Sequence, residues 1–177
     1  MVRGILISGT GGQGIVSAGE LLSDALFRAG YEVVNTRSYG SEARGGSSRS
    51  EVLVSDEEIH NLQPDEADIL IAMSVQAYRR FIGRIKRNGL LLVDVDVLSR
   101  LGEGELRDDV ELVPVAAGET SAGLGNPIVA NMVLLGALAK RTELLTLDML
   151  KEAVEALMPP PIRGINLRAL KAGYASA

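Results

Sequence analysis

The sequence predicts an α/β fold: a single three-layer domain spanning residues 1–177, with a mostly parallel sheet and helices on both faces. The first observation behind this prediction is that short apolar runs alternate along the chain with segments of helical period. The second is composition, because 46% of the residues are hydrophobic but only 3% are aromatic. A core of Leu, Ile, Val and Ala is typical of parallel strands that are covered on both sides.

The first part of the chain contains the glycine-rich start of this pattern. Residues 4–8 form a short apolar run that ends in glycines and predict the first strand. Apolar residues then recur at helical spacing over 15–29, and Gly30 is expected to end that helix. Residues 31–36 predict the second strand, and the alternating segment 50–54 predicts the third.

The remaining strands and helices follow in alternation. Strands are expected at 68–73, 90–95 and 110–115, and helices at 75–85, 127–140, 148–157 and 166–174. Residues 86–89, Lys-Arg-Asn-Gly, predict a turn, and a polar loop is expected after Val115. Pro127 suits a first helical turn, where its missing N–H costs nothing, and three prolines at 159–161 are expected to separate the last two helices.

The composition excludes several kinds of reactive centre. The chain has no cysteine, which rules out disulfides, thiolate nucleophiles, iron–sulfur clusters and zinc bound by thiolates. Its one histidine, His60, is not sufficient for a zinc or non-haem iron site and is expected in a solvated loop. We therefore expect no metal or redox centre and no catalytic residue in this chain.

Charge and hydropathy indicate the compartment and exclude two classes of partner. A net charge of −5 argues against nucleic acid, whose binding requires a basic face. No apolar run approaches the roughly 20 residues of a transmembrane helix, and the start of the chain does not resemble a signal peptide. The expected location is the cytoplasm, without membrane contact.

The glycine-rich segment between the first strand and the first helix is a candidate binding loop. Residues 9–14 fit the pattern G-x-G-x-x-G, which suggests a Rossmann-like first βαβ unit. Backbone N–H groups at the start of such a helix suit a phosphate or carboxylate. The residues expected to bind a cofactor are Gly9, Thr10, Gly11, Gly12, Gln13 and Gly14. The alternative is a glycine-rich turn that binds no ligand.

The residues at the end of the second predicted strand indicate whether the loop suits a dinucleotide. An enzyme of that class places an acidic residue at the end of this strand, where it binds the ribose. Here the sequence is Val-Asn-Thr-Arg at 34–37, so NAD is disfavoured. Arg37 leaves NADP open, because a guanidinium suits a 2′-phosphate.

A second polar loop, residues 38–46, combines an aromatic ring, charges and glycines. Tyr39 offers a flat amphipathic surface, and Arg44 offers a planar fork for a carboxylate or phosphate. The residues expected to shape a loop or partner contact here are Tyr39, Gly40, Glu42, Gly45 and Gly46. A solvated loop with an internal contact between Glu42 and Arg44 is the alternative.

Three segments together resemble one protein family. They are the GxGGQG loop at 9–14, the run Tyr39-Gly40-x-Glu42-x-Arg44-Gly45-Gly46, and the segment 126–137 with Asn126, Pro127, Asn131 and Gly136. The sequence resembles the gamma subunit, or gamma domain, of the 2-oxoacid:ferredoxin oxidoreductases. The likeness spans roughly residues 4 to 140, and the tail beyond Leu145 adds little to it.

The resemblance implies a hetero-oligomeric assembly. Members of the family convert a 2-oxoacid and coenzyme A into an acyl-CoA and carbon dioxide, and reduce ferredoxin. Alpha, beta and ferredoxin-like delta subunits would hold thiamine diphosphate, magnesium and the iron–sulfur clusters. This chain would be non-catalytic, inactive alone, and would line the region where coenzyme A enters. Its glycine loop and Arg44 would bind coenzyme A or its phosphates.

The run 38–48 also bears on the oxoacid. It is most similar to enzymes of the 2-oxoglutarate type, whereas pyruvate-type subunits tend to follow the Arg-Gly pair with an apolar residue and Pro. Branched-chain and indolepyruvate enzymes stay close competitors. Two alternatives from other classes are an independent NADP-binding oxidoreductase and a pure scaffold that binds only protein.

Four further features have both a functional and a structural interpretation. Asp94 and Asp96 face the same side of a strand and suit a base or a magnesium site, but helix capping or a solvated strand end is favoured. Asn126 is expected to cap a helix. Asn131 is expected to support the glycine loop or a subunit contact. The basic run at 79–87 is either a docking patch for an acidic partner such as ferredoxin or a solvated helix face.

Overall fold

The computed structural model describes residues 1–39, 46–62 and 64–177. Its strands are β1 (Arg3–Thr10), β2 (Glu32–Ser38), β3 (Ser47–Ser55), β4 (Ala67–Ala72), β5 (Ile85–Asp94) and β6 (Glu111–Val115). Its α-helices are α1 (Ile15–Arg28), α2 (Val75–Phe81), α3 (Val95–Leu98), α4 (Ala117–Gly123), α5 (Ala130–Arg141), α6 (Leu147–Leu157) and α7 (Pro160–Ser176). Two 3-10 helices, η1 (Ile82–Arg84) and η2 (Pro127–Val129), precede β5 and α5.

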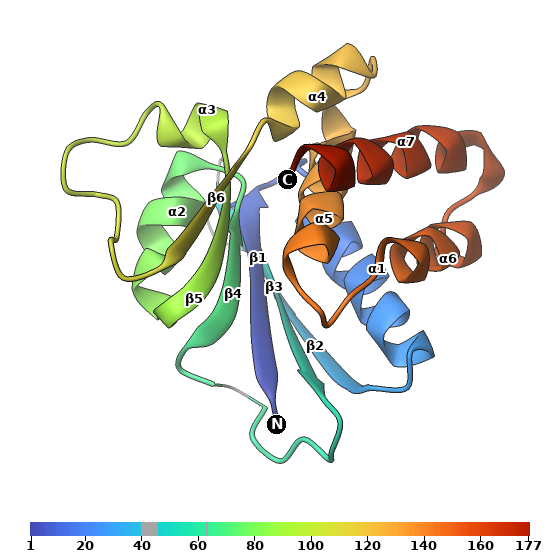
Figure 1. Cartoon of the computed structure of the whole chain (residues 1–177), viewed down its shortest axis with the longest axis horizontal. Helices are drawn as coiled ribbons and strands as arrows, with labels where there is room; N and C mark the ends of the chain where they lie inside the picture. Colours follow the sequence, from blue (N-terminus) through green and yellow to red (C-terminus); the bar gives the residue numbers. More distant parts are fainter. Residues whose placement is uncertain (40–45, 63) are drawn as a thin grey trace.

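The strands form one sheet in the order β2-β3-β1-β4-β5-β6 (Figure 1). Strands β1, β4, β5 and β6 are parallel neighbours, whereas β3 is antiparallel to both β1 and β2. The predicted mostly parallel sheet is therefore confirmed. Strand β2 runs in the same direction as β1 but does not pair with it, because β3 lies between them. A short connection between β2 and β3 favours this hairpin-like pairing.

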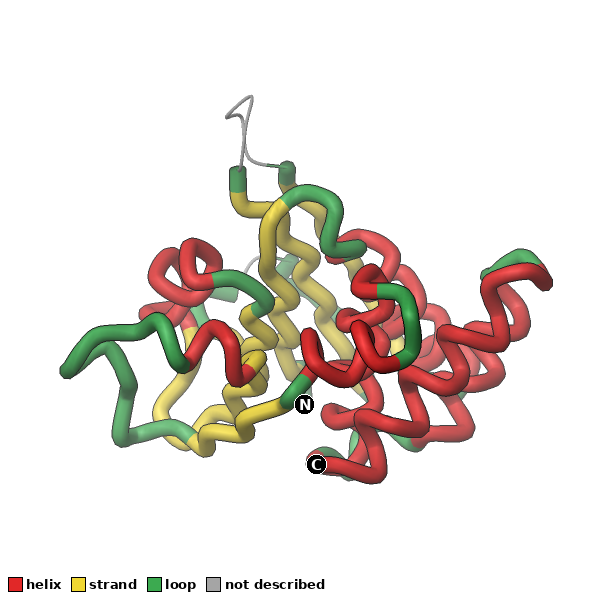
Figure 2. Tube along the Cα trace, turned by 90° about the horizontal axis from the view of Figure 1, so that it is seen from above, coloured by secondary structure: helices red, strands yellow, loops and turns green. Residues whose placement is uncertain are grey.

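Helices cover both faces of the sheet, as predicted. Figure 2 shows the sheet between two helical layers: α1, α5, α6 and α7 on one face, α2 and α3 on the other. Successive residues of β1 point to opposite layers. Ile5 and Ile7 join the larger core beside α1 and α5, whereas Leu6 joins the smaller core with Tyr78 and Phe81 of α2.

Membrane-spanning helices are not found in the part of the chain that the structure describes. None of the helices there is both long enough and apolar enough to cross a bilayer.

Two element boundaries in the middle of the chain differ from the prediction. The expected helix 75–85 ends at Phe81, and η1 follows it. The expected turn at 86–89 lies inside β5, where the pairing register with β4 shifts. Asn88 has φ 61°, a left-handed conformation that Asn tolerates, and its N–H bonds the carbonyl of Asp109 at 2.7 Å. The turn-forming residues therefore make a local irregularity in the strand.

The C-terminal part of the chain contains one helix that was not predicted and one that begins earlier than predicted. The expected polar loop after Val115 contains α4. The last helix begins at Pro160, not near Asn166, so the prolines start this helix. Proline is compatible with a first helical turn because the N–H groups there have no intrahelical acceptor.

Helices α5 and α7 pack closely enough for their backbones to touch. A Cβ atom added at Gly136 of α5 would lie 2.1 Å from the carbonyl oxygen of Leu170, and one at Gly173 of α7 would lie 1.9 Å from that of Val133. These glycines set the distance between the two helices, because any side chain at either position would push them apart.

We predict that Gly136→Ala lowers the free energy of unfolding by about 3 kcal/mol, at the upper end of the usual cost of overpacking. The matched control is Gly164→Ala in α7, where the added Cβ would meet only the end of the flexible Arg168 side chain at 3.6 Å. Alanine favours helix by about 1 kcal/mol over glycine, so this control keeps or raises stability. Urea unfolding measures both, and equal stability of the two variants contradicts the packing argument.

Candidate functional site

The glycine loop lies where the sheet changes the direction of its connections. From β1 the chain crosses one face through α1, and from β4 it crosses the other face through α2 (Figure 1). The connections that leave the carboxyl ends of β1 and β4 therefore diverge, and open α/β sheets bind ligands at such a point. A cleft of about 750 Å³ lies there, which we call the switch cleft. Its walls include Thr10, Gly11, Gln13, Met73, Ser74, Gln76, Asp94, Asp96, Arg100, Gly118 and Ser121.

A second hollow of about 370 Å³ adjoins the switch cleft. We call it the helix hollow, because the first turn of α1 forms one wall. The two share Thr10 and Gly11, so the glycine loop is their common rim. The helix hollow is also lined by Gly12, Gly14, Ile15, Val16, Ser17, Tyr39, Ser48 and Ile128. Ser48 and Ile128 lie within the runs 38–48 and 126–137 that carry the resemblance, but neither was predicted as a site residue.

The backbone of the glycine loop begins within the sheet. Gly9 and Thr10 belong to β1, where they pair with Ser48 and Ser47 of β3. Gly12 has φ 86° and Gly14 has φ 71°, which are left-handed conformations that favour glycine. The chain thus leaves the strand, turns over Gly11 and Gly12, and enters α1 at Gly14.

The start of α1 offers backbone donors to the helix hollow. Gly14 is the N-cap and has no side chain to accept a hydrogen bond from the first turn, and that turn contains no acidic residue. The first N–H groups of a helix have no intrahelical acceptor and carry partial positive charge. None of the described residues that line this hollow is acidic. The arrangement suits an anionic group such as a phosphate.

Two amide side chains hold the glycine loop from opposite sides. Gln13 accepts a hydrogen bond from the backbone N–H of Thr10 at 2.8 Å and donates one to the carbonyl oxygen of Met73 at 2.9 Å. Asn131 of α5 donates to the carbonyl oxygen of Gly14 at 3.0 Å. The expected support of the loop by Asn131 is therefore present as a direct contact, although it joins residues 117 positions apart.

Asp94 and Asp96 line the switch cleft at the end of β5. The Asp94 carboxylate caps α3 by accepting from the N–H of Asp96 at 3.2 Å, and it accepts from the N–H of Gly118 at 2.9 Å. Burial raises the pKa of Asp94, and the two N–H donors oppose that shift. The capping interpretation is confirmed. Among the described residues, no group of three or more His, Cys, Asp or Glu side chains is placed to bind a metal ion.

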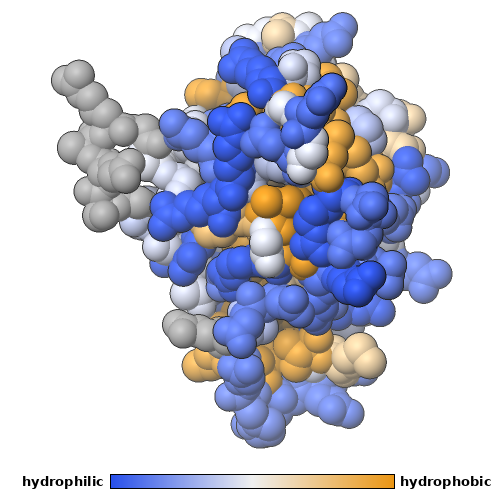
Figure 3. Space-filling model, turned by 90° about the vertical axis from the view of Figure 1, so that its left-hand side faces the viewer, coloured by the Kyte–Doolittle hydropathy of each residue, from blue (hydrophilic) through white to orange (hydrophobic). Residues whose placement is uncertain are grey.

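The basic run near α2 is engaged in contacts within the chain. Arg79 pairs with Glu105 at 2.6 Å, and this guanidinium lowers the pKa of Glu105 to about 2. The remaining contacts join Arg80 to Ser47, Arg84 to Glu51, Lys86 to Asp68 and Arg87 to Asp109. Figure 3 shows this side of the molecule as mostly hydrophilic, with apolar atoms between polar ridges. These pairings favour a solvated structural surface over a free docking patch.

Neither Arg37 nor His60 joins the site. Arg37 lies on β2, which β3 separates from the glycine loop, and it pairs with Glu20 at 2.8 Å. Arg37 is therefore not placed to bind a 2′-phosphate beside the glycine loop, which disfavours NADP. His60 is exposed outside the helices and strands, as expected.

The candidate residues of the second loop are only partly described. Tyr39 lies at the helix hollow with 68% of its surface exposed, and Gly46 directly precedes β3. Gly40, Glu42, Arg44 and Gly45 lie outside the described residues. Asn126 caps η2 by accepting from the N–H of Ile128 at 3.1 Å, as expected.

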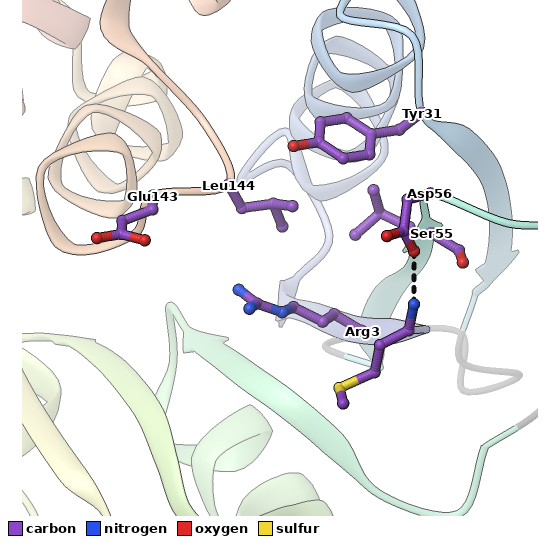
Figure 4. A pocket seen from close by; sticks show the side chains of 8 residues that line it. Arg3, Tyr31, Ser55, Asp56, Glu143 and Leu144 are labelled. Carbon is purple, nitrogen blue, oxygen red and sulfur yellow. Dashed lines mark hydrogen bonds and ion pairs between the residues drawn. The ribbon is translucent and has the colours of Figure 1, made fainter.

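A further hollow of about 270 Å³ lies at the opposite end of the strands, beside the start of β1 (Figure 4). The side chains around it include Arg3, Tyr31, Ser55, Asp56, Glu143 and Leu144. Asp56 pairs with the amino group of Met1, and both partners are largely exposed. Exposed ion pairs contribute little to stability, and the glycine loop lies at the other end of β1, so we assign no site here.

Comparison with known protein families identifies the family of this chain. Residues 4–176 match the family described as pyruvate ferredoxin/flavodoxin oxidoreductase. The chain belongs to this family. Its relatives include the 2-oxoglutarate synthase subunit KorC of Methanothermobacter marburgensis, which is 39% identical over 98% of this chain and 95% of the relative. The resemblance inferred from the three sequence segments is thereby confirmed.

Solved structures of the family share the fold. The gamma subunit of a keto/oxoacid ferredoxin oxidoreductase from Geobacter sulfurreducens is 32% identical, with a TM-score of 0.84 over 99% of this chain and 98% of that one. A 2-oxoglutarate:ferredoxin oxidoreductase from Magnetococcus marinus, with 2-oxoglutarate, coenzyme A and succinyl-CoA bound, is 27% identical. Its TM-score is 0.87 over 98% of this chain and 30% of that longer one.

The burial of Asp94 makes stability depend on pH in a defined direction. A raised folded-state pKa means that the native protein binds this proton more tightly than the unfolded chain. The stabilisation that comes from this proton is fully present below pH 3.8, the ordinary pKa of Asp, and it is lost as pH rises through the raised pKa. We predict that Asp94→Asn, which keeps an oxygen acceptor, removes this pH-dependent loss.

The control for that prediction is Asp94→Ala, which removes the acceptor itself. Because neither variant titrates at this position, Asp94→Ala should be less stable than Asp94→Asn by about 1 kcal/mol across the whole pH range, as for other lost helix caps. Urea unfolding of both variants from pH 4 upward measures the effects. If the stability of Asp94→Asn changes with pH as that of the natural protein does, the proposed burial effect on the carboxylate is wrong.

Proposed function

We propose that this chain is the non-catalytic gamma subunit of a 2-oxoacid:ferredoxin oxidoreductase of the 2-oxoglutarate type. Its near full-length similarity to a 2-oxoglutarate synthase subunit supports this assignment. The observation that carries the proposal is the glycine loop at the switch point of the sheet, with one hollow on each side. The loop is suited to binding, and the chain has no thiolate for redox chemistry.

The ligand proposed for the loop is coenzyme A. This molecule has anionic phosphates at one end and a long neutral arm with two amides and a terminal thiol. The helix hollow, which has backbone donors and no acidic lining residue among those described, suits the phosphates. The switch cleft contains Asp94 and Asp96, which repel anions but accept hydrogen bonds from amides. The phosphates would lie at the start of α1, and the arm would pass over Gly11.

The remaining cofactors of the enzyme are assigned to other subunits, because this chain lacks the residues to bind them. Thiamine diphosphate, magnesium and iron–sulfur clusters would be held by alpha, beta and ferredoxin-like delta subunits, since iron–sulfur clusters need Cys ligands that this sequence does not contain. Ferredoxin would accept the electrons. Tyr39 and Ile128 are 68% and 61% exposed at the rim of the helix hollow and are suited to contact either the ligand or a neighbouring subunit. The proposed location is the cytoplasm.

Gly11 gives the most direct test of coenzyme A binding. A Cβ atom at this position would meet nothing within 4 Å, so Gly11→Val adds bulk only toward the space assigned to the ligand. In the assembled enzyme we predict a KM for coenzyme A that is about tenfold higher, equal to about 1.4 kcal/mol, with little change in the KM for the oxoacid.

The matched control is Gly83→Val in η1, where an added Cβ would also meet nothing within 4 Å. It lies away from both hollows and should leave coenzyme A kinetics unchanged. Steady-state kinetics and thermal unfolding of the two assembled variants are compared. A correctly assembled Gly11→Val enzyme with normal coenzyme A dependence refutes the ligand role and favours a scaffold that contacts only protein.

Arg44 separates ligand binding from assembly. Arg44→Lys keeps the charge but loses the planar fork, and Arg44→Ala loses both. A charge-assisted hydrogen bond contributes roughly 1.5–3 kcal/mol, so we predict a rise of about 10–100-fold in the KM for coenzyme A with Arg44→Ala, and a smaller rise with Arg44→Lys. Size-exclusion chromatography checks that the complex stays intact. A complex that dissociates, and that excess coenzyme A does not rescue, assigns Arg44 to a subunit contact instead.

A further inference from the structure

We propose that Gln13 and Asn131 are positioning residues that fix the shape of the glycine loop before any ligand binds. The inference rests on the proposed role of this loop in coenzyme A binding, which it extends. Neither side chain is assigned a contact with the ligand. Their role is to hold the backbone around Gly11 in one conformation.

Gln13 fastens the loop to the neighbouring strand end. Its Oε1 accepts from the N–H of Thr10, at the last position of β1, and its Nε2 donates to the carbonyl of Met73, just after β4. The N–H of Met73 in turn donates to the carbonyl of Ser8 at 2.9 Å. The Gln13 amide thus bridges the two strands where their connections diverge, and both of its ends are used.

The first glycine of the motif is explained by this bridge. A Cβ atom at Gly9 would lie 2.4 Å from Oε1 of Gln13 and 2.7 Å from Cδ1 of Ile15. Any side chain at Gly9 would displace the amide from its position. The glycine is therefore required by the Gln13 contact, whether or not a ligand approaches.

Asn131 fixes the other end of the loop. It is only 5% exposed, and its Nδ2 donates to the carbonyl of Gly14 while its Oδ1 accepts from the N–H of Met132 at 2.8 Å. A Cβ atom at Gly14 would lie 2.5 Å from that Nδ2, and φ there is 71°. The buried amide and the left-handed backbone together hold the N-cap of α1 in place.

These two anchors flank a short span that a backbone hydrogen bond closes, from the N–H of Gln13 to the carbonyl oxygen of Thr10 at 3.3 Å. Gly11 and Gly12 lie between Thr10 and Gln13, and a Cβ added at either would meet nothing within 4 Å. The amides of this span and of the first turn of α1 thus keep their directions in the absence of a ligand. A site whose donors are already oriented loses less conformational entropy on binding and gains affinity accordingly.

The chemistry of the bridge gives a titratable test. Gln13→Glu keeps the shape and the acceptor, but an ionised carboxylate cannot donate to the Met73 carbonyl and repels it. When protonated, the introduced carboxyl can again accept from Thr10 and donate to Met73. The charged groups that share its cleft are Asp94, Asp96 and Arg100. The two carboxylates favour the protonated form, and Arg100 opposes them.

The bridge should therefore be restored at low pH. Partial burial and the Met73 carbonyl favour the neutral form, whereas the N–H of Thr10 favours the charged form. We expect the first two to dominate and to raise the pKa of the introduced carboxyl above its ordinary value of about 4.3. In the folded variant the bridge forms below that raised pKa and is lost as pH rises through it. The natural protein, with a neutral amide at this position, has no such transition.

The experiment uses the assembled enzyme with Gln13→Glu and measures two quantities at about pH 5 and about pH 8. One is the protection of the backbone amides of residues 10–17 against hydrogen exchange, expressed relative to an unstructured peptide at the same pH. The other is the dissociation constant of coenzyme A at equilibrium. At the higher pH we expect protection to fall about tenfold and the dissociation constant to rise about tenfold, with both returning toward the natural values at the lower pH.

Two further variants isolate the cause. Gln76→Glu introduces the same charge into the switch cleft without either hydrogen bond of the bridge, so loop protection should stay as in the natural protein at both pH values. Gly11→Val should weaken coenzyme A binding while loop protection stays high. Asn131→Asp, which loses the donor to Gly14 when ionised, should reproduce the effect of Gln13→Glu from the other end of the loop.

The outcomes separate this proposal from the proposed function. Unchanged protection in Gln13→Glu at the higher pH overturns the positioning role, whatever happens to coenzyme A. Protection that falls and recovers with pH while the coenzyme A dissociation constant stays constant supports the positioning role but overturns coenzyme A as the ligand of the loop. Equal loss of protection in Gln76→Glu also overturns the proposal, because charge alone would then be the cause.

Discussion

The site depends on the hydrogen bonds of one side-chain amide at the switch point of the sheet. Where β1 and β4 send their connections to opposite faces, the ladder between them ends, and the backbone groups beyond it need other partners. Gln13 provides two such partners, one to Thr10 and one to Met73. This connection ties the loop that starts α1 to the end of β4, and the same loop is the rim that the switch cleft and the helix hollow share.

The charges around the loop divide the site into two regions. On one side the first turn of α1 offers N–H donors, and on the other Asp94 and Asp96 line the switch cleft. Partial burial raises the pKa of Asp94, but the N–H groups of Asp96 and Gly118 stabilise its charged form. A ligand with an anionic end and a neutral hydrogen-bonding arm suits both regions in one orientation.

Local patterns predicted much of the fold, because the period of apolar residues and the caps of helices are set by near neighbours. The position of the glycine loop between β1 and α1, the cap at Asn126 and the apolar strand β4 follow from such patterns. Local patterns do not predict contacts between residues that are distant in the sequence. The insertion of β3 between β1 and β2 depends on pairing across the sheet, and the pairing of Arg79 with Glu105 on a contact 26 positions away. The start of α7 at Pro160 is a local feature, but prolines both begin and interrupt helices.

The glycines of the loop do not all argue for a ligand. Gly9 and Gly14 leave room for the amides of Gln13 and Asn131, and Gly12 has the positive φ that favours glycine. Each of these is required by the fold itself and would be glycine in a loop that binds nothing. Gly11 differs, because its φ is not positive and a side chain there would meet no atom of this chain within 4 Å. A glycine without an internal reason, on the rim shared by two hollows, is best explained by something outside the chain that approaches the backbone closely. The case for a ligand at this loop therefore rests on Gly11 more than on the match to the G-x-G-x-x-G pattern.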